Sequence, residues 1–185
     1  MRLTPTEIAG LTWLDSPVYT DARGAFMVGW RQADLSALAG WRPFVQESLS
    51  TSRRGVLRGL HLQHPRPQGK LVRVIAGEVF DVAVDLRPDS PTFLHHVSSP
   101  LRADGPALWL PPGLAHGFLV TSEEAIVLYQ VTDDWMPEAE HTVRWDDPTL
   151  GIDWPLTQPP VLSLRDATAP ALSPVLAALG QRGGS

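Results

Sequence analysis

Prolines and glycines divide this chain into short apolar runs. The 185 residues include 18 prolines and 15 glycines, and the segments between them are rich in valine, leucine, phenylalanine and tryptophan. Proline disrupts helix interiors, and apolar residues with helical spacing are hard to find before the C-terminal segment. Many short strands separated by turn residues favour a sandwich or barrel over a parallel α/β sheet. The sequence therefore predicts an all-β fold.

The composition limits the size and the partners of this fold. With 43% hydrophobic residues and seven tryptophans, residues 1–185 suffice for one globular domain, and we expect a frayed tail at 181–185. The net charge of -5 disfavours nucleic acid or an anionic membrane surface as the main partner. The lack of cysteine excludes disulfides and thiolate chemistry. Neither a membrane span nor a secretory leader is recognisable, so we expect a cytoplasmic protein.

The clearest strands lie in KLVRVIAGEVFDVAVDL, residues 70–86. Its central Gly-Glu step fits a two-residue hairpin loop, and the resulting register can be derived. The register places Ile75 opposite Phe80 on a mainly core face, and Lys70 opposite Asp85 on a polar face. Further strands are expected at 93–101, 107–110, 117–121, 125–132 and 142–145, with short peripheral helices at 32–40 and 173–180.

The run GVLRGLHLQ, residues 55–63, places Arg58 and His61 inside an apolar segment. The two are three positions apart, so a regular strand would direct them to opposite faces. A β-bulge at Gly59 would shift the alternation and bring both side chains into one pocket. A lone histidine is more often a core residue with one hydrogen bond. Here several charged residues are expected nearby, including Lys70 and Asp81, and they favour a functional site.

The segment GPALWLPPGLAHGF, residues 105–118, resembles the second motif of the cupin superfamily of jelly-roll barrels. Metal-binding cupins carry H-x-H and a glutamate in the first motif, whereas Gln63 stands here in place of the second histidine. A metal site formed by His61, His116 and a carboxylate stays open at this point. Tyr129 taken alone would be a packed strand aromatic with its hydroxyl at the barrel rim.

Seven segments together resemble the dTDP-4-dehydrorhamnose 3,5-epimerase family. They follow the family order at near-constant spacing over about residues 15–166. The resemblance implies a cupin-type jelly-roll barrel or sandwich with a few short helices, and no metal or other cofactor. It also implies a homodimer in which N-terminal strands are exchanged. The segments are DARGAF, FVQES, GVLRGLHLQ, QGKLVRVIAGEVFDVAVDLRPDSPTF, LPPGLAHGFLV, LYQVTDD and RWDDPTLGIDWP.

The activity implied by this resemblance is epimerisation of a dTDP-linked 4-keto-6-deoxyhexose. Carbons 3 and 5 flank the ketone, so removal of either proton gives an enolate, and protonation from the opposite face inverts the centre. Motif matching implies that His61 is the base, that Asp166 orients its imidazole, and that Tyr129 is the acid. Lys70 and Arg58 would bind and stabilise the developing oxyanion, and the resemblance implies that Lys70 is a catalytic residue as well.

Further family positions imply contacts to the sugar nucleotide. Its diphosphate is anionic, so a local cluster of arginine and lysine is expected despite the acidic total. The implied substrate-binding residues are Arg23, Phe26, Gln46, Ser48, Arg58, Lys70, His116, Glu140 and Arg165. The departures from the family pattern are Val28, Ser48, Leu62, Asp134, Trp135 and Arg165.

These departures concern substrate contacts more than acid-base groups, and they leave alternatives open. A different 4-keto sugar or nucleoside fits equally, as does inversion at carbon 3 or carbon 5 alone. Keto-group migration on a related sugar nucleotide is the runner-up activity. A metal-dependent cupin enzyme and a non-catalytic sugar-binding barrel are the other classes. A binding module needs no acid and base together, so the complete set favours the epimerase.

Overall fold

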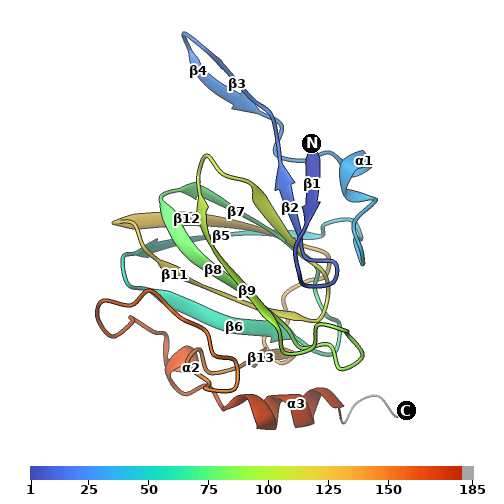
Figure 1. The fold of residues 1–185 in the computed structure, drawn as a ribbon, viewed down its shortest axis with the longest axis vertical. Coiled ribbons are helices and arrows are strands. Elements are labelled where there is room, and N and C mark those ends of the chain that lie inside the picture. Colours follow the sequence, from blue (N-terminus) through green and yellow to red (C-terminus); the bar gives the residue numbers. More distant parts are fainter. Residues whose placement is uncertain (181–185) are drawn as a thin grey trace.

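The computed structural model describes residues 1–180, and the predicted frayed tail at 181–185 lies outside them. Strands dominate this part of the chain, and the helices are short (Figure 1). In chain order the elements are β1 (Arg2–Pro5), β2 (Thr12–Asp15), β3 (Val18–Asp21), β4 (Gly24–Met27), α1 (Gln32–Leu35), β5 (Gln46–Arg53), β6 (Leu57–Gln63), β7 (Lys70–Ala76), β8 (Glu78–Asp85), β9 (His96–Arg102), β10 (Ala107–Leu110), β11 (Leu114–Val120), β12 (Glu124–Val131), β13 (Glu140–Thr142), α2 (Leu164–Ala167) and α3 (Leu172–Gly180).

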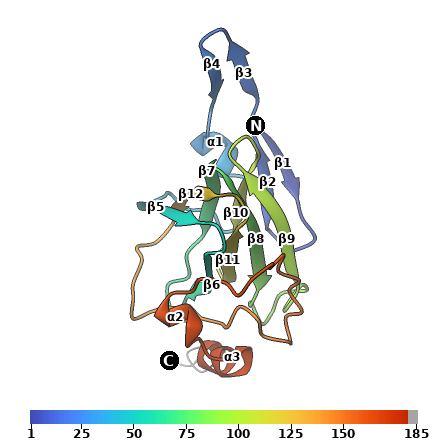
Figure 2. The same cartoon turned by 90° about the vertical axis from the view of Figure 1, so that its left-hand side faces the viewer.

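Two antiparallel sheets form a sandwich, which confirms the predicted all-β class (Figures 1 and 2). One sheet has six strands in the order β1-β2-β10-β7-β12-β5, and the other has five in the order β13-β6-β11-β8-β9. Apolar side chains at alternate positions fill the space between them, for example Val72 and Val127 from the first sheet and Phe118 from the second. This pattern follows from the two-residue period of strands that bury one face.

Short elements cover parts of the outer faces. On the five-stranded sheet, Leu172 and Val175 of α3 belong to the same apolar cluster as Leu60 of β6. On the six-stranded sheet, Leu35 of α1 lies in a cluster with Trp109 of β10. Within residues 1–180, no helix has the length and apolar character needed to cross a membrane.

The predicted hairpin at residues 70–86 is wrong, because β7 and β8 belong to different sheets. β7 pairs with β10 and β12, whereas β8 pairs with β11 and β9. Gly77 alone connects them, with φ of 75°, and a Cβ atom there would lie 2.0 Å from the carbonyl oxygen of Glu124. Both strands are buried on both faces over much of their length. A hairpin with one face in the core and the other in solvent would not show this burial pattern. Ile75, expected on the core face, is 47% exposed, whereas its neighbours Val72 and Val74 lie in the central core.

The other predicted elements agree better. β10 matches 107–110, and β9, β11, β12 and β13 overlap their predicted ranges with shifted ends. The helix expected at 173–180 is α3, whereas the one expected at 32–40 shortens to the four residues of α1. The sequence did not reveal β5, whose residues are mostly polar and whose position at the sheet edge leaves its outer face exposed.

The β3–β4 hairpin projects away from the sandwich, at the end opposite to α3 (Figures 1 and 2). Three of its apolar side chains, Val18, Tyr19 and Phe26, are 48%, 63% and 66% exposed. An isolated two-stranded ribbon is only marginally stable in water. Its exposed apolar residues therefore suit it to docking on another surface.

Candidate active site

A β-bulge brings Arg58 and His61 to the same cavity, as predicted. In the pairing of β6 with β11, His61 lies opposite His116 and Arg58 lies opposite Phe118, so three residue steps on β6 match two on β11. Gly59 occupies the bulge with φ of 122°. The extra residue reverses the alternation between the two functional side chains, and both line the cavity.

Gly59→Ala should disrupt this bulge. The added Cβ would lie 2.6 Å from the Cα of Gly117 and 2.8 Å from the carbonyl oxygen of His116, at a φ that side chains disfavour. We expect a stability loss of roughly 3 kcal/mol, with a melting temperature lowered by about 6–12 °C and activity lost at assay temperature. Gly55→Ala is the matched control, because Gly55 has φ of 81° but no atom within 4 Å of the added Cβ. A Gly59→Ala variant no less stable than Gly55→Ala would contradict the steric argument.

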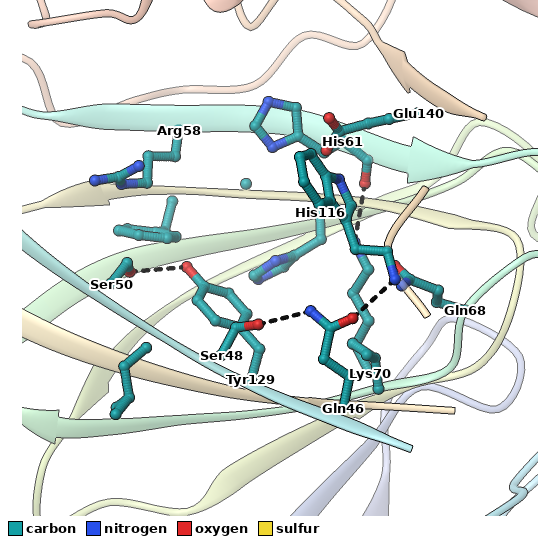
Figure 3. Close-up of a pocket in the computed structure, with 15 residues that line it drawn as sticks. Gln46, Ser48, Ser50, Arg58, His61, Gln68, Lys70, His116, Tyr129 and Glu140 are labelled. Atoms are coloured by element: carbon teal, nitrogen blue, oxygen red, sulfur yellow. Dashed lines mark hydrogen bonds between the residues drawn. The ribbon is translucent and has the colours of Figure 1, made fainter. Parts of the chain in front are cut away.

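The cavity lies between the two sheets and has a volume of about 360 Å³. Figure 3 shows Arg58 and His61 along one wall, with Tyr129, Ser50 and Gln46 along the other. Eight of the predicted site residues line it, namely Gln46, Ser48, Arg58, His61, Lys70, His116, Tyr129 and Glu140. The sandwich thus brings together side chains from strands that are far apart in the sequence.

Asp166, which does not line the cavity, forms a hydrogen bond with the imidazole of His61. The Nε2 of His61 lies 2.6 Å from Oδ1 of Asp166, and Ser163 donates to Oδ2 of the same carboxylate at 2.7 Å. Burial alone raises the pKa of the Asp166 carboxyl, but the hydrogen bonds from His61 and Ser163 outweigh it and hold that pKa below its usual range. An ionised Asp166 accepts a hydrogen bond from the Nε2–H group, so in the neutral imidazole of His61 the lone pair is on Nδ1.

Tyr129 approaches the cavity from the opposite sheet. Its hydroxyl lies 3.2 Å from the hydroxyl of Ser50, and its ring contacts His116 edge-on with centroids 6.3 Å apart. Burial raises the pKa of Tyr129 well above its usual range, although the Ser50 hydrogen bond and the charge of Arg58 oppose this effect. Tyr129 is therefore a protonated donor at neutral pH.

Two cationic side chains belong to the same cavity. Burial lowers the pKa of the Lys70 ammonium to about 8, so this group is mostly charged at neutral pH and loses its charge as the pH rises through that value. Its Nζ donates to the carbonyl oxygen of His61 at 3.4 Å. The guanidinium of Arg58 donates from Nε to the hydroxyl of Ser52 at 3.0 Å. These two cations give the cavity a local positive charge, although the net charge of the chain is -5.

A second histidine–aspartate pair lies at the floor of the cavity. Nε2 of His116 is 2.7 Å from Oδ2 of Asp81, and both side chains are almost fully buried. Because the ring is held through Nε2, its Nδ1 is the nitrogen left for a molecule in the cavity. The histidine at the cupin-like motif is thus oriented by a carboxylate from β8.

One end of the cavity is formed around Gln46. Gln46 donates to the hydroxyl of Ser48 at 2.9 Å and accepts the backbone amide of Trp135 at 2.9 Å. Trp135 lines the cavity with half of its surface exposed. Glu140 lines it as well and forms an ion pair with Arg165, which therefore lies beside the cavity and not in its lining.

Gln63 has a structural role. Its side-chain amide donates to the carbonyl oxygens of Arg66 and Asp134, and its Oε1 accepts the backbone amide of Met136. It therefore ties the loop after β12 to β6. Within residues 1–180, His, Asp and Glu side chains form no group of three that could hold a metal ion.

Two predicted binding residues, Arg23 and Phe26, lie outside this cavity. Both belong to the projecting β3–β4 hairpin, where Arg23 pairs with Asp21 and keeps 89% of its side chain exposed. Neither residue lines the cavity of its own chain. The structure therefore separates them from the other predicted site residues.

Several residues around the cavity escaped the sequence analysis. Ser50 contacts Tyr129, but a single serine in a strand gives no signal of its own. Asp81, one of the charged residues expected near His61, is the partner of His116. The alternation of serine in QESLSTSR was the available signal for β5, because period-two polarity marks one face of a strand. The other missed lining residues are Leu49, Gln68, Gly117, Phe118 and Val131. Trp135, one of the departures from the family pattern, lines the cavity as well.

The chain is similar to proteins of one known family. The sequence model of the dTDP-4-dehydrorhamnose 3,5-epimerase family matches residues 5–174. A protein of that name from Pseudomonas aeruginosa is 46% identical over 175 residues, covering 94% of this chain and 97% of the relative. One from Neisseria gonorrhoeae is 47% identical over 167 residues, and there the match spans 90% of this chain but about half of the relative, 51%.

A solved structure has the same fold. It is a dTDP-6-deoxy-D-glucose-3,5-epimerase from Legionella pneumophila in complex with dTDP-4-keto-L-rhamnose, with a TM-score of 0.92 and 43% identity over 96% of both chains. The resemblance seen in seven separate segments thus extends over nearly the whole sequence and over the fold. This chain belongs to the dTDP-4-dehydrorhamnose 3,5-epimerase family.

Proposed function

We propose that this chain is a dTDP-4-dehydrorhamnose 3,5-epimerase that acts on dTDP-4-keto-6-deoxyglucose. Membership of the family supports this activity. The observation that carries it is the placement of His61 and Tyr129 on opposite walls of one cavity, because they come from different sheets. Inversion needs a base on one face of the sugar and an acid on the other.

The chemistry follows from the protonation states. Nδ1 of His61 removes the proton from carbon 3 or carbon 5, and the electron pair of that C–H bond moves toward the ketone as an enolate forms. Asp166 stabilises the imidazolium produced. Tyr129 then protonates the same carbon from the other face, and its own O–H electron pair stays on the phenolate oxygen. Exchange with water returns both groups to their starting states.

Positive charge stabilises the enolate. Lys70 and Arg58 line the cavity and supply the charge and hydrogen-bond donors that an oxyanion requires. The half-exposed indole of Trp135 offers a stacking surface for the nucleotide base, beside the polar groups of Gln46 and Ser48. The cavity thus divides into a reactive part around His61 and a nucleotide-binding part around Trp135.

Deuterium exchange tests the proposed activity. The protein is incubated with dTDP-4-keto-6-deoxyglucose in deuterated water, and deuterium at carbons 3 and 5 is followed by NMR. We expect deuterium at both carbons together with dTDP-4-keto-rhamnose as product. Exchange at a single carbon would make the protein a mono-epimerase, and no exchange at either carbon would exclude this substrate.

We further propose a homodimer in which the β3–β4 hairpin of one chain completes the cavity of its partner. The family resemblance implies exchanged N-terminal strands, and Arg23 and Phe26 do not line the cavity of their own chain, where Arg23 is exposed. The eight-residue strand β5 is a free sheet edge beside the cavity, and Leu49 on it is 64% exposed. Binding of Arg23 to the diphosphate would then require the partner chain. We also expect the protein to act in the cytoplasm.

Mixed dimers test this arrangement. Arg23→Glu and Tyr129→Phe are expected to be poorly active alone, one for lack of substrate binding and the other for lack of the acid. When the two are co-expressed with different tags, half of the dimers are mixed and each has one complete site, so activity should recover to about one quarter of wild type. If mixed dimers are isolated and show no recovery, Arg23 does not act in the partner's cavity.

A further inference from the structure

The inward face of β5 carries a row of serine hydroxyls. Positions 48, 50 and 52 of QESLSTSR share one face of the strand, because successive side chains of a strand point to opposite faces. Each hydroxyl contacts a different side chain of the candidate site: Ser48 accepts from Gln46, Ser50 bonds with Tyr129, and Ser52 accepts from Arg58. Through these serines, β5 contacts Tyr129, the predicted acid, and Arg58, one of the two predicted cations.

The register of β5 and β12 explains the contact between Ser50 and Tyr129. Tyr129 lies opposite Ser48, and its ring reaches diagonally to Ser50, two residues further along β5. A diagonal neighbour on the same face of a sheet is within reach of an aromatic side chain. Figure 3 shows the two hydroxyl groups directed toward each other at the cavity wall.

The surroundings of Tyr129 make this hydrogen bond important for proton delivery. Burial disfavours the phenolate, and the negative charge of Asp81 disfavours it further. The groups that favour the phenolate are the Ser50 hydroxyl and the Arg58 guanidinium. Because a hydrogen bond to a charged oxygen is stronger than one to a neutral oxygen, the contact with Ser50 strengthens as Tyr129 gives up its proton.

We propose that Ser50 is a positioning residue for proton delivery by Tyr129, and this inference rests on the proposed function. Ser50 donates its hydrogen to the phenol oxygen, which leaves the hydrogen of Tyr129 free to point at the sugar carbon. During transfer the Tyr129 O–H bond breaks and its electron pair stays on oxygen, while the enolate electron pair forms the new C–H bond. Ser50 keeps its own proton and holds the phenolate until water restores it.

Ser50→Ala separates this role from a structural one. In deuterated water, exchange catalysed by His61 should stay within about threefold of wild type, whereas inversion should slow by about 10- to 100-fold. The ratio of exchange to inversion therefore rises. Ser50→Thr, which retains the hydroxyl, should restore the wild-type ratio. Ser98→Ala on the exposed edge strand β9 is the matched control and should leave both rates unchanged.

Three results would overturn the proposal. Inversion at the wild-type rate in Ser50→Ala would show that Tyr129 needs no such donor. Equal losses of exchange and inversion would place Ser50 in folding or substrate binding. Failure of Ser50→Thr to restore the ratio would exclude the hydroxyl as the active group. Wild-type protein in the same assay tests the proposed function separately, because its failure to exchange either hydrogen would reject the substrate and not the role of Ser50.

Discussion

His61→Ala should lower kcat/KM for dTDP-4-keto-6-deoxyglucose by about 10²- to 10⁴-fold, the range that a general base contributes. The variant loses the ring nitrogen that accepts the proton, and Asp166 is left without its imidazole partner. Because one base serves both carbons in this account, deuterium exchange should disappear at carbon 3 and at carbon 5 together. NMR in deuterated water measures both positions in a single sample.

The matched control for this variant is His95→Ala. His95 is exposed on the loop before β9 and does not line the cavity, so exchange should proceed at the wild-type rate. Asp166→Asn provides a second comparison, because it keeps the imidazole but removes the carboxylate that fixes its tautomer. A folded His61→Ala protein that still exchanges either hydrogen near the wild-type rate would mean that another group is the base.

Tyr129→Phe should separate proton removal from inversion. Loss of the hydroxyl removes the acid from the wall opposite His61, so inversion should fall by about 10²- to 10⁴-fold. His61 is unchanged, so it can remove a proton and return deuterium to the same face. We therefore expect deuterium in recovered substrate with its configuration retained, while little epimerised product forms.

Stability is the control for Tyr129→Phe. The change removes one hydrogen bond, to Ser50, and keeps the ring contacts with His116 and Phe118. A loss of about 1 kcal/mol, or about 2–4 °C in melting temperature, is expected. Normal turnover by a Tyr129→Phe protein of this stability would show that a different group, or water, is the acid.

The sequence predicts which segments form strands better than it predicts which strands pair with each other. Local pattern places a strand at the Arg58–His61 segment, and the glycine between them marks the bulge that joins their side chains in one cavity. The pairing of β7 is not encoded locally, because a Gly-Glu step fits a hairpin turn as well as a crossing between sheets. Long-range packing decides between the two, and both strands bury enough apolar surface to join separate sheets.

The same limit applies to the site residues. Motif matching identified eight of the side chains that line the cavity, but Ser50, the partner of Tyr129, and Ser163, the partner of Asp166, are defined only by three-dimensional contacts. Arg23 and Phe26 of the β3–β4 hairpin, by contrast, were predicted from the sequence but do not line the cavity. Sequence assigned Arg23 to the site, whereas in the single chain it is exposed to solvent and paired with Asp21.

A crystal structure of the protein with a dTDP-linked hexose bound tests the central claim most directly. We expect the hexose to lie between the two sheets, with Nδ1 of His61 and the hydroxyl of Tyr129 on opposite faces of the ring, each about 3–3.5 Å from the carbon that it serves. Lys70 or Arg58 should contact the 4-keto oxygen. A hexose with both groups on the same face, or one bound outside the cavity, would contradict inversion by this pair.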